Sequence, residues 1–398
     1  MLLAIFASSI VACKKPALSD DEKKESPSDG TREQLTLDSI YLYTKHTYLW
    51  NDVLPNYDVF NPRKYTTANS DLLNFKKELY DISQYKINPL TRHPYEKTAV
   101  SGLSKYSYLA EESSDTRFKA ALNGSTTTTV SALVSGSYGY LKISQFSHLN
   151  ELSVSLNEAF SGFSSSGITS LIVDLRNNPG GYVETAQYLA NLIAVSAMND
   201  KVMYTEHFNS QMQGGKISIL KKQPYLDENN QPVFVNGRRA TYADVDFSVV
   251  GNTFLFKKIG QLNTIINLYF LVNGGTASAS ELLINALKPY FNILLIGEQT
   301  YGKPVGSFGI KIDTYTLYAV SFLIKNAKGE GDYFNGLSPE IPATDENLGD
   351  TPVLAFANAM VLINKPNPKG VMVSIVSFSS GKMGFAKPEM IKEKLRLR

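Results

Sequence analysis

From Gly139 onward, short apolar runs alternate with amphipathic segments, and this alternation constrains the fold more than any other feature of the chain. The apolar runs have the length of buried strands, and the segments between them place apolar residues at helical spacing. Strands are predicted at residues 140–143, 171–175, 265–272, 293–296, 307–313 and 317–324, and helices at residues 149–160, 185–195 and 280–287. This order predicts an α/β domain whose functional groups lie in the loops at strand ends.

The composition of the 398 residues narrows the classes of protein and of site. With 43% hydrophobic and 19% charged residues, the chain can bury a large core. A formal net charge of +2 gives no electrostatic reason to expect a nucleic-acid partner. The single cysteine, Cys13, excludes a disulfide within the chain, and the four scattered histidines argue against a histidine metal site. We therefore expect chemistry based on oxygen and nitrogen groups, without a metal or cofactor.

Residues 1–13 are predicted to be a secretion signal that ends in a lipidation site. Their apolar run is shorter than the roughly 20 residues that span a bilayer. The residues IVAC, which end at Cys13, resemble the lipobox of bacterial lipoproteins, in which the cysteine receives the lipid. Residues 14–33 are polar and charged, as in a solvated linker. The expected location is the bacterial cell envelope, at the outer membrane, in the periplasm or at the cell surface, with Cys13 as the membrane anchor.

Three other stretches differ from the strand and helix alternation. Helical spacing of apolar residues at 35–54 and 72–80 predicts a small helical domain over residues 34–95. Residues 96–135 are rich in Ser, Thr and Gly and are expected to form loops and short strands. A polar stretch between Met198 and Leu262 interrupts the alternation and is predicted to be a β-hairpin insertion.

The first strand-to-helix junction that could carry chemistry reads VNGGTASASELLINAL. A buried strand ends in two glycines, and either Ser278 or Ser280 then lies at the start of a helix. The unpaired backbone N–H groups and the helix dipole favour an anion there. Ser278 followed by Glu281 also fits a capping box, so this stretch alone leaves helix capping and catalysis equally open.

The second junction reads GEQTYGKPVGS and places Lys303 in a glycine-rich turn after a strand. A solvated surface lysine is the simpler interpretation of this turn alone. However, a strand–helix–strand unit between Ser278 and Lys303 would bring both residues to the same edge of one sheet. A serine hydroxyl needs a base, and a lysine can serve if burial lowers its pKa from about 10.4 to near neutrality.

These motifs together resemble peptidase family S41, the C-terminal processing or tail-specific serine peptidases. The resemblance covers Tyr138–Asp345 and rests on YGYLKISQF, LIVDLRNNPGG, TASASE, TYGKPVGS and NGLSPEIPATD in family order. It implies a crotonase/ClpP-like catalytic core over residues 138–345, behind the helical N-terminal domain. By the same resemblance, Ser278 is the nucleophile, in preference to Ser280, and Lys303 is the general base.

The upstream motif at residues 174–181 has a physical interpretation of its own. A buried strand runs into Pro-Gly-Gly, where glycine permits positive φ and turns backbone N–H groups toward a ligand. With the amide of Ala279, the amide of Gly180 or Gly181 could form an oxyanion hole. A tight turn without a catalytic role is the alternative. Asp174 and Arg176 are expected to pair and brace the loop.

The chain departs from the family pattern at three places. Ser307 stands where tail-specific enzymes carry a glutamine that orients the lysine, and Pro289 stands where some carry an acid. The signatures of a substrate-binding PDZ domain are absent between residues 97 and 137, so residues 96–137 are expected to be a linker or a reduced remnant of that domain. Residues 346–398 are expected to form a C-terminal extension.

The sequence therefore predicts a lipid-anchored serine endopeptidase that acts on polypeptides through Ser278 and Lys303, with Ser280, Glu281 and Ser307 in support. The alternative is a peptide-binding or ligand-binding lipoprotein of the same fold with weak or no catalysis.

Overall fold

The computed structural model describes residues 27, 29–67, 69–111, 129–215, 217–227, 231–364 and, for the backbone, 376–378. Cys13, most of the predicted linker and residues 112–128 lie outside this part of the chain. The helices are α2 (Arg32–Thr47), α3 (Tyr57–Phe60), α4 (Asp71–Ser83), α6 (Leu149–Ser165), α7 (Val183–Ile193), α8 (Ser210–Gln213), α9 (Ala279–Leu287), α10 (Asp345–Leu348) and α11 (Pro352–Ile363). The strands are β1 (Tyr108–Glu111), β2 (Val130–Ser135), β3 (Tyr138–Ile143), β4 (Ser170–Asp174), β5 (Val202–Phe208), β6 (Phe234–Val235), β7 (Arg238–Arg239), β8 (Thr253–Leu255), β9 (Asn267–Val272), β10 (Asn292–Gly297), β11 (Val305–Gly306), β12 (Ile310–Ile312), β13 (Tyr315–Tyr318), β14 (Phe322–Asn326), β15 (Ile341–Pro342) and β16 (Val376–Phe378).

A seven-stranded sheet in the order β15-β10-β9-β4-β3-β2-β16 forms the centre of the α/β part. Strands β3, β4, β9, β10 and β15 of this sheet run parallel to one another, whereas β2 and β16 are antiparallel to their neighbours. Every residue of β4 is buried, as expected for a strand covered on both faces. Because β4, β9 and β10 run in the same direction, the loops that follow them lie at one edge of the sheet.

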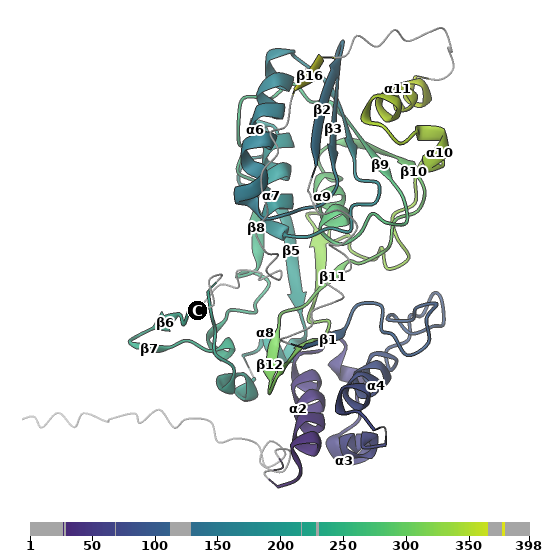
Figure 1. Ribbon diagram of the computed structural model, residues 1–398. Coiled ribbons are helices and arrows are strands. Elements are labelled where there is room, and N and C mark those ends of the chain that lie inside the picture. Colours follow the sequence, from purple (N-terminus) through teal and green to yellow (C-terminus); the bar gives the residue numbers. More distant parts are fainter. Residues whose placement is uncertain are drawn as a thin grey trace, which may run out of the picture.

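Helices cover both faces of this sheet (Figure 1). Helices α6, α7 and α9 lie on one face, and their buried aliphatic and aromatic side chains join the main core. Helix α11 packs on the other face, where Phe356 stacks on Tyr140 of β3. The residues after 345 thus include a helix that completes the core. Among the described residues, no helix is both long and apolar enough to cross a membrane.

The small helical N-terminal region is confirmed and lies at the opposite end of the molecule from α11 (Figure 1). Helix α2 begins at Arg32, just before the predicted limit at residue 34, and Thr31 and Gln34 form its capping box. Helices α2 and α4 pack against each other and against the three-stranded sheet β1-β13-β12. This region therefore shares a core with strands from late in the chain.

Several predicted boundaries differ from the structure. The seven-stranded sheet already includes β2, so it begins before the predicted limit at Tyr138. Residues 307–313 and 317–324 were each expected to be one strand, but residues 307–309 belong to no strand, and residues 319–321 separate β13 from β14. There it passes from the three-stranded sheet to the four-stranded sheet β11-β14-β5-β8. The sequence pattern does not reveal such an interruption, because the residues on both sides of it are largely buried.

The polar stretch between Met198 and Leu262 does contain a hairpin, β6–β7, with Asn236 and Gly237 in its turn. It also contains β5, a central strand of the four-stranded sheet that the sequence analysis did not identify.

Candidate active site

Three loops meet at the carboxyl edge of the central sheet, and the buried residue Asn178 joins two of them. The loop after β4 carries Asn178, whose carbonyl oxygen accepts a hydrogen bond from the amide of Ala277 at 3.0 Å. Its side-chain amide donates to the carbonyl oxygen of Ile143 at 3.0 Å. The loop after β9 is joined to the loop after β10 by the amide of Tyr301, which donates to the carbonyl oxygen of Thr276 at 3.0 Å. The three loops therefore form one connected structure.

Ser278 is the N-cap of α9 and has a strained backbone, with φ 57° and ψ −115°. Non-glycine residues rarely adopt positive φ, and such strain is found preferentially at functional sites. The neighbouring Gly180 permits this arrangement, because a Cβ atom there would lie 2.9 Å from the Cβ atom of Ser278. Ser278 is partly exposed, unlike most of the residues around it in the loop and helix.

Ser280 has a different environment from Ser278. It is fully buried, and its hydroxyl donates a hydrogen bond to the carbonyl oxygen of Asn178 at 3.1 Å. The structure therefore gives Ser280 a role in holding the loop after β4, whereas Ser278 is partly exposed.

Glu281 connects the serine loop to the lysine turn. Its buried carboxylate accepts hydrogen bonds from the amides of Ser278 at 3.0 Å, Gly302 at 2.7 Å and Lys303 at 2.8 Å, and from the hydroxyl of Thr300 at 2.5 Å. The amides of Ser278 and Lys303 share the same oxygen, Oε2. Burial raises the pKa of Glu281, and these four hydrogen bonds lower it in part. The predicted capping-box residue thus also brings the two loops side by side.

Lys303 follows a turn that only glycine can make. Gly302 has φ +85°, and a Cβ atom there would lie 2.5 Å from the carbonyl oxygen of Phe334 and from the amide of Gly336. Burial lowers the pKa of the Lys303 amine, and the charges of Glu281 and Glu96 partly oppose this shift. A lowered pKa increases the fraction of neutral amine, which is the form that can accept a proton.

The three predicted oxyanion-hole residues lie together, but their amides are not equivalent. The amide of Gly180 donates to Oδ1 of Asn178 at 2.9 Å and is therefore occupied. The amide of Ala279 is the first of α9 and has no acceptor within the helix. The backbone of Gly181, at φ +133°, is placed by the bridge between this residue and Phe146. Of these three amides, that of Gly180 is thus engaged within its own loop.

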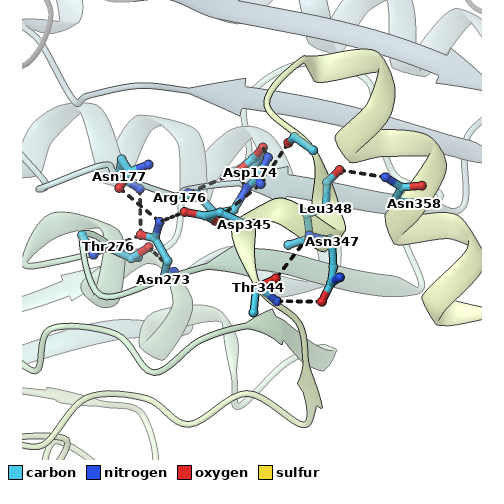
Figure 2. A network of polar contacts seen from close by, with 12 residues as sticks. Asp174, Arg176, Asn177, Asn273, Thr276, Thr344, Asp345, Asn347, Leu348 and Asn358 are labelled. Carbon is cyan, nitrogen blue, oxygen red and sulfur yellow. Dashed lines mark hydrogen bonds and ion pairs between the residues drawn. The ribbon is translucent and has the colours of Figure 1, made fainter.

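The expected pairing of Asp174 with Arg176 is confirmed, and it belongs to a larger polar network (Figure 2). Arg176 also lies 3.5 Å from Asp345 of α10, and Asp345 accepts a hydrogen bond from the side-chain amide of Asn273 at 2.8 Å. The side-chain oxygen of Asn273 in turn accepts a hydrogen bond from the backbone amide of Asn177 at 2.9 Å. This network ties the loops after β4 and β9 to α10.

The structure leaves Ser307 without an assigned role, because no hydrogen bond joins this residue to Lys303 in the described part of the chain. Sequence reasoning missed Asn178 and Thr300, whose contacts join segments far apart in the chain. No group of three or more potential metal-ligating side chains is present among the described residues.

Comparison with known proteins identifies the family. The model of peptidase family S41 matches residues 137–342, half of the chain. The chain belongs to peptidase family S41. This confirms the resemblance and the α/β fold class inferred from the sequence.

Among curated relatives, the carboxy-terminal processing protease CtpA of Bacillus subtilis is 26% identical over 230 residues, which are 57% of this chain and 39% of the relative. The carboxyl-terminal-processing protease of Synechocystis is 30% identical over 169 residues, which are 42% of this chain and 28% of the relative. The matches thus span less than half the length of these relatives.

Solved structures of similar proteins include the photosystem II D1 C-terminal processing protease, with 14% identity and a TM-score of 0.49 over 84% of this chain and 98% of that one. Another is the S41 protease of Bacteroides fragilis that is described as putative, with 20% identity and a TM-score of 0.42 over 60% and 57% of the two chains.

Proposed function

We propose that this protein is a serine endopeptidase in which Ser278 is the nucleophile and Lys303 is the general base. The observation that carries the proposal is the shared carboxylate of Glu281, which holds the backbone amides of both residues. Membership of family S41 and the curated relatives, which are described as proteases, support the same activity. The proposed substrates are polypeptides.

The proposed reaction gives each of these groups one role. The neutral amine of Lys303 removes the proton of the Ser278 hydroxyl as its oxygen attacks the peptide carbonyl. The amides of Ala279 and Gly181 stabilise the resulting oxyanion. Collapse of the tetrahedral intermediate breaks the C–N bond, and the lysine proton passes to the leaving amine. Water, deprotonated by Lys303, then hydrolyses the ester on Ser278 and restores both side chains.

The environment of Lys303 supports the base role because burial lowers the pKa of its amine. Among the described residues, the amine has no hydrogen-bond or ion-pair partner that would hold it in the charged form. A surface lysine commonly pairs with a carboxylate, and such a pair stabilises the charged amine. Lys303 has no such ion pair with any residue that the structure describes, so its amine gives up its proton more readily than that of a paired lysine.

Digestion of a peptide library by the purified protein tests this proposal. Cleavage should disappear in Ser278→Ala and Lys303→Met but persist in Ser280→Ala, which is the matched control because its hydroxyl bonds within the fold. Folding of each variant is checked by circular dichroism. Equal cleavage by Ser278→Ala and wild type would refute the assigned nucleophile. Binding of library peptides without any cleavage would favour a binding protein of the same fold.

We also propose that the mature protein is anchored in the cell envelope by a lipid on Cys13. The support is the lipobox-like sequence that ends at this residue. Cells fed a labelled fatty acid should incorporate the label into the wild-type protein and not into Cys13→Ala. Label retained in the variant would contradict the anchor.

A further inference from the structure

A buried carboxylate from the N-terminal part of the chain organises the segment next to the lysine turn. Glu96 is fully buried and accepts hydrogen bonds from the hydroxyl of Tyr48 at 2.8 Å, from the amides of Tyr106 at 3.2 Å and Ser107 at 2.7 Å, and from the hydroxyl of Ser107 at 2.8 Å. The hydroxyl of Ser107 also accepts the amide of Val320 at 3.1 Å. Four donors on one carboxylate fix the backbone of residues 106 and 107.

This fixed segment directly contacts the turn that precedes Lys303. The hydroxyl of Tyr106, which is 4% exposed, donates to the carbonyl oxygen of Gly302 at 2.6 Å. The amine of Lys105 donates to the carbonyl oxygen of Phe334 at 2.7 Å and lies over the ring of Tyr301. The turn is therefore held from two sides, since Glu281 binds the amide of Gly302 and Tyr106 binds its carbonyl group.

We propose that the segment from Glu96 to Ser107 is part of the active site, with Tyr106 as a positioning residue that holds the turn of Lys303 closed. The inference deepens the proposed function and rests on it. The segment was expected to be a linker or a domain remnant, yet its contacts link the helical region, through Tyr48, to the proposed base. Through these contacts the N-terminal region limits the access of water to the Lys303 amine.

Two substitutions near Lys303 are expected to shift the pKa of its amine in opposite directions. The negative charges of Glu281 and Glu96 raise the pKa of the Lys303 amine, while burial lowers it. Tyr333 and Lys105 are further titratable groups that interact with Glu281. Removing the Tyr106 hydroxyl opens the turn to water and raises the pKa of Lys303. Replacing Glu96 by glutamine removes a negative charge and lowers that pKa.

The test measures two quantities in wild type, Tyr106→Phe and Glu96→Gln. The first is the pH dependence of kcat/KM for a cleaved peptide. The second is the pH dependence of acetylation of Lys303 by acetic anhydride, followed by mass spectrometry, which needs no peptidase activity. Tyr65→Phe is the matched control, because Tyr65 donates a similar hydrogen bond to Asp81 at 2.9 Å elsewhere in the helical region.

The expected result is a shift of the acid limb by about one pH unit to higher pH in Tyr106→Phe and to lower pH in Glu96→Gln, with acetylation midpoints moving alike. In Tyr65→Phe the acid limb of the kcat/KM profile stays at the wild-type pH, even if the variant is less stable to unfolding. If wild type cleaves peptides but both variants keep the wild-type limb and midpoint, the positioning role is refuted. If wild type cleaves nothing, the proposed function fails, whatever the acetylation midpoints show.

Discussion

Replacement of Gly180 by alanine is expected to disable the proposed oxyanion hole. Gly180 has φ +97°, and an added Cβ atom would lie 2.8 Å from the carbonyl oxygen of Ala277 and 2.9 Å from the amide nitrogen of Ala279. Both neighbours are backbone atoms of the loop that carries Ser278, so they have to move to relieve the overlap. The amide that moves is one of the two proposed to bind the oxyanion.

Two contributions set the size of the effect. An alanine at such a φ costs about 1–3 kcal/mol, and overpacking against fixed backbone costs about 1–3 kcal/mol more. Loss of one oxyanion donor lowers kcat by about 10²–10³-fold in comparable sites. We therefore expect Gly180→Ala to be folded but less stable, with kcat reduced by at least about 100-fold and KM changed far less.

Gly237→Ala separates these contributions. Gly237 has φ +76° in the β6–β7 hairpin, and nothing lies within 4 Å of an added Cβ atom. This control bears the conformational cost without the overlap and should retain wild-type kcat. Steady-state kinetics and thermal unfolding of both variants provide the comparison. A kcat for Gly180→Ala within a few-fold of wild type would refute the proposed placement of the oxyanion hole.

Three further predictions follow from buried polar groups. Because burial lowers the pKa of Lys303, kcat/KM should rise with pH through a midpoint below the ordinary lysine value, and a midpoint at or above that value would contradict the base role. Ser280→Ala should cost about 1 kcal/mol in urea unfolding, because its hydrogen bond to Asn178 is lost, and should lower kcat far less than Ser278→Ala does. Glu78 of α4 is fully buried without a hydrogen-bond partner among the described residues, and burial, then the charge of Asp38, raises its pKa. The folded state therefore favours the protonated acid, and stability falls as pH rises above the unfolded value of about 4.3. Glu78→Gln should remove this loss of stability, so the urea midpoints measured in acid and at neutral pH should differ less in the variant than in wild type. An unchanged difference would refute the role given to Glu78.

Local patterns in the sequence predicted the elements that position the site. The strands β4, β9 and β10 are apolar runs bounded by Gly or polar residues, so their existence could be predicted to within two residues at each end. The burial of β10 is only partial, because its first three residues are exposed or half-buried. The choice between Ser278 and Ser280 could not be made from spacing, because both lie at the start of α9. Burial of Ser280 and its bond to Asn178 separate them in the structure.

The hydrogen bonds between segments far apart in the chain could not be predicted from the sequence. Glu281 was expected as a capping partner, but its bonds to the amides of Gly302 and Lys303 require the packing of α9 against the next loop. The position of Glu96 within a stretch without periodicity gave no signal of its buried role. Such polar residues act through tertiary contacts, which a single sequence does not encode in its local pattern.

Covalent labelling of Ser278 is the most direct test of the central claim. A fluorophosphonate probe followed by peptide mapping should label Ser278 in wild type, with a rate that rises with pH as the Lys303 amine loses its proton. The account predicts that Lys303→Ala abolishes this labelling while Ser280→Ala preserves it. Labelling that maps to Ser280, or labelling of Ser278 at an undiminished rate in Lys303→Ala, would contradict the account.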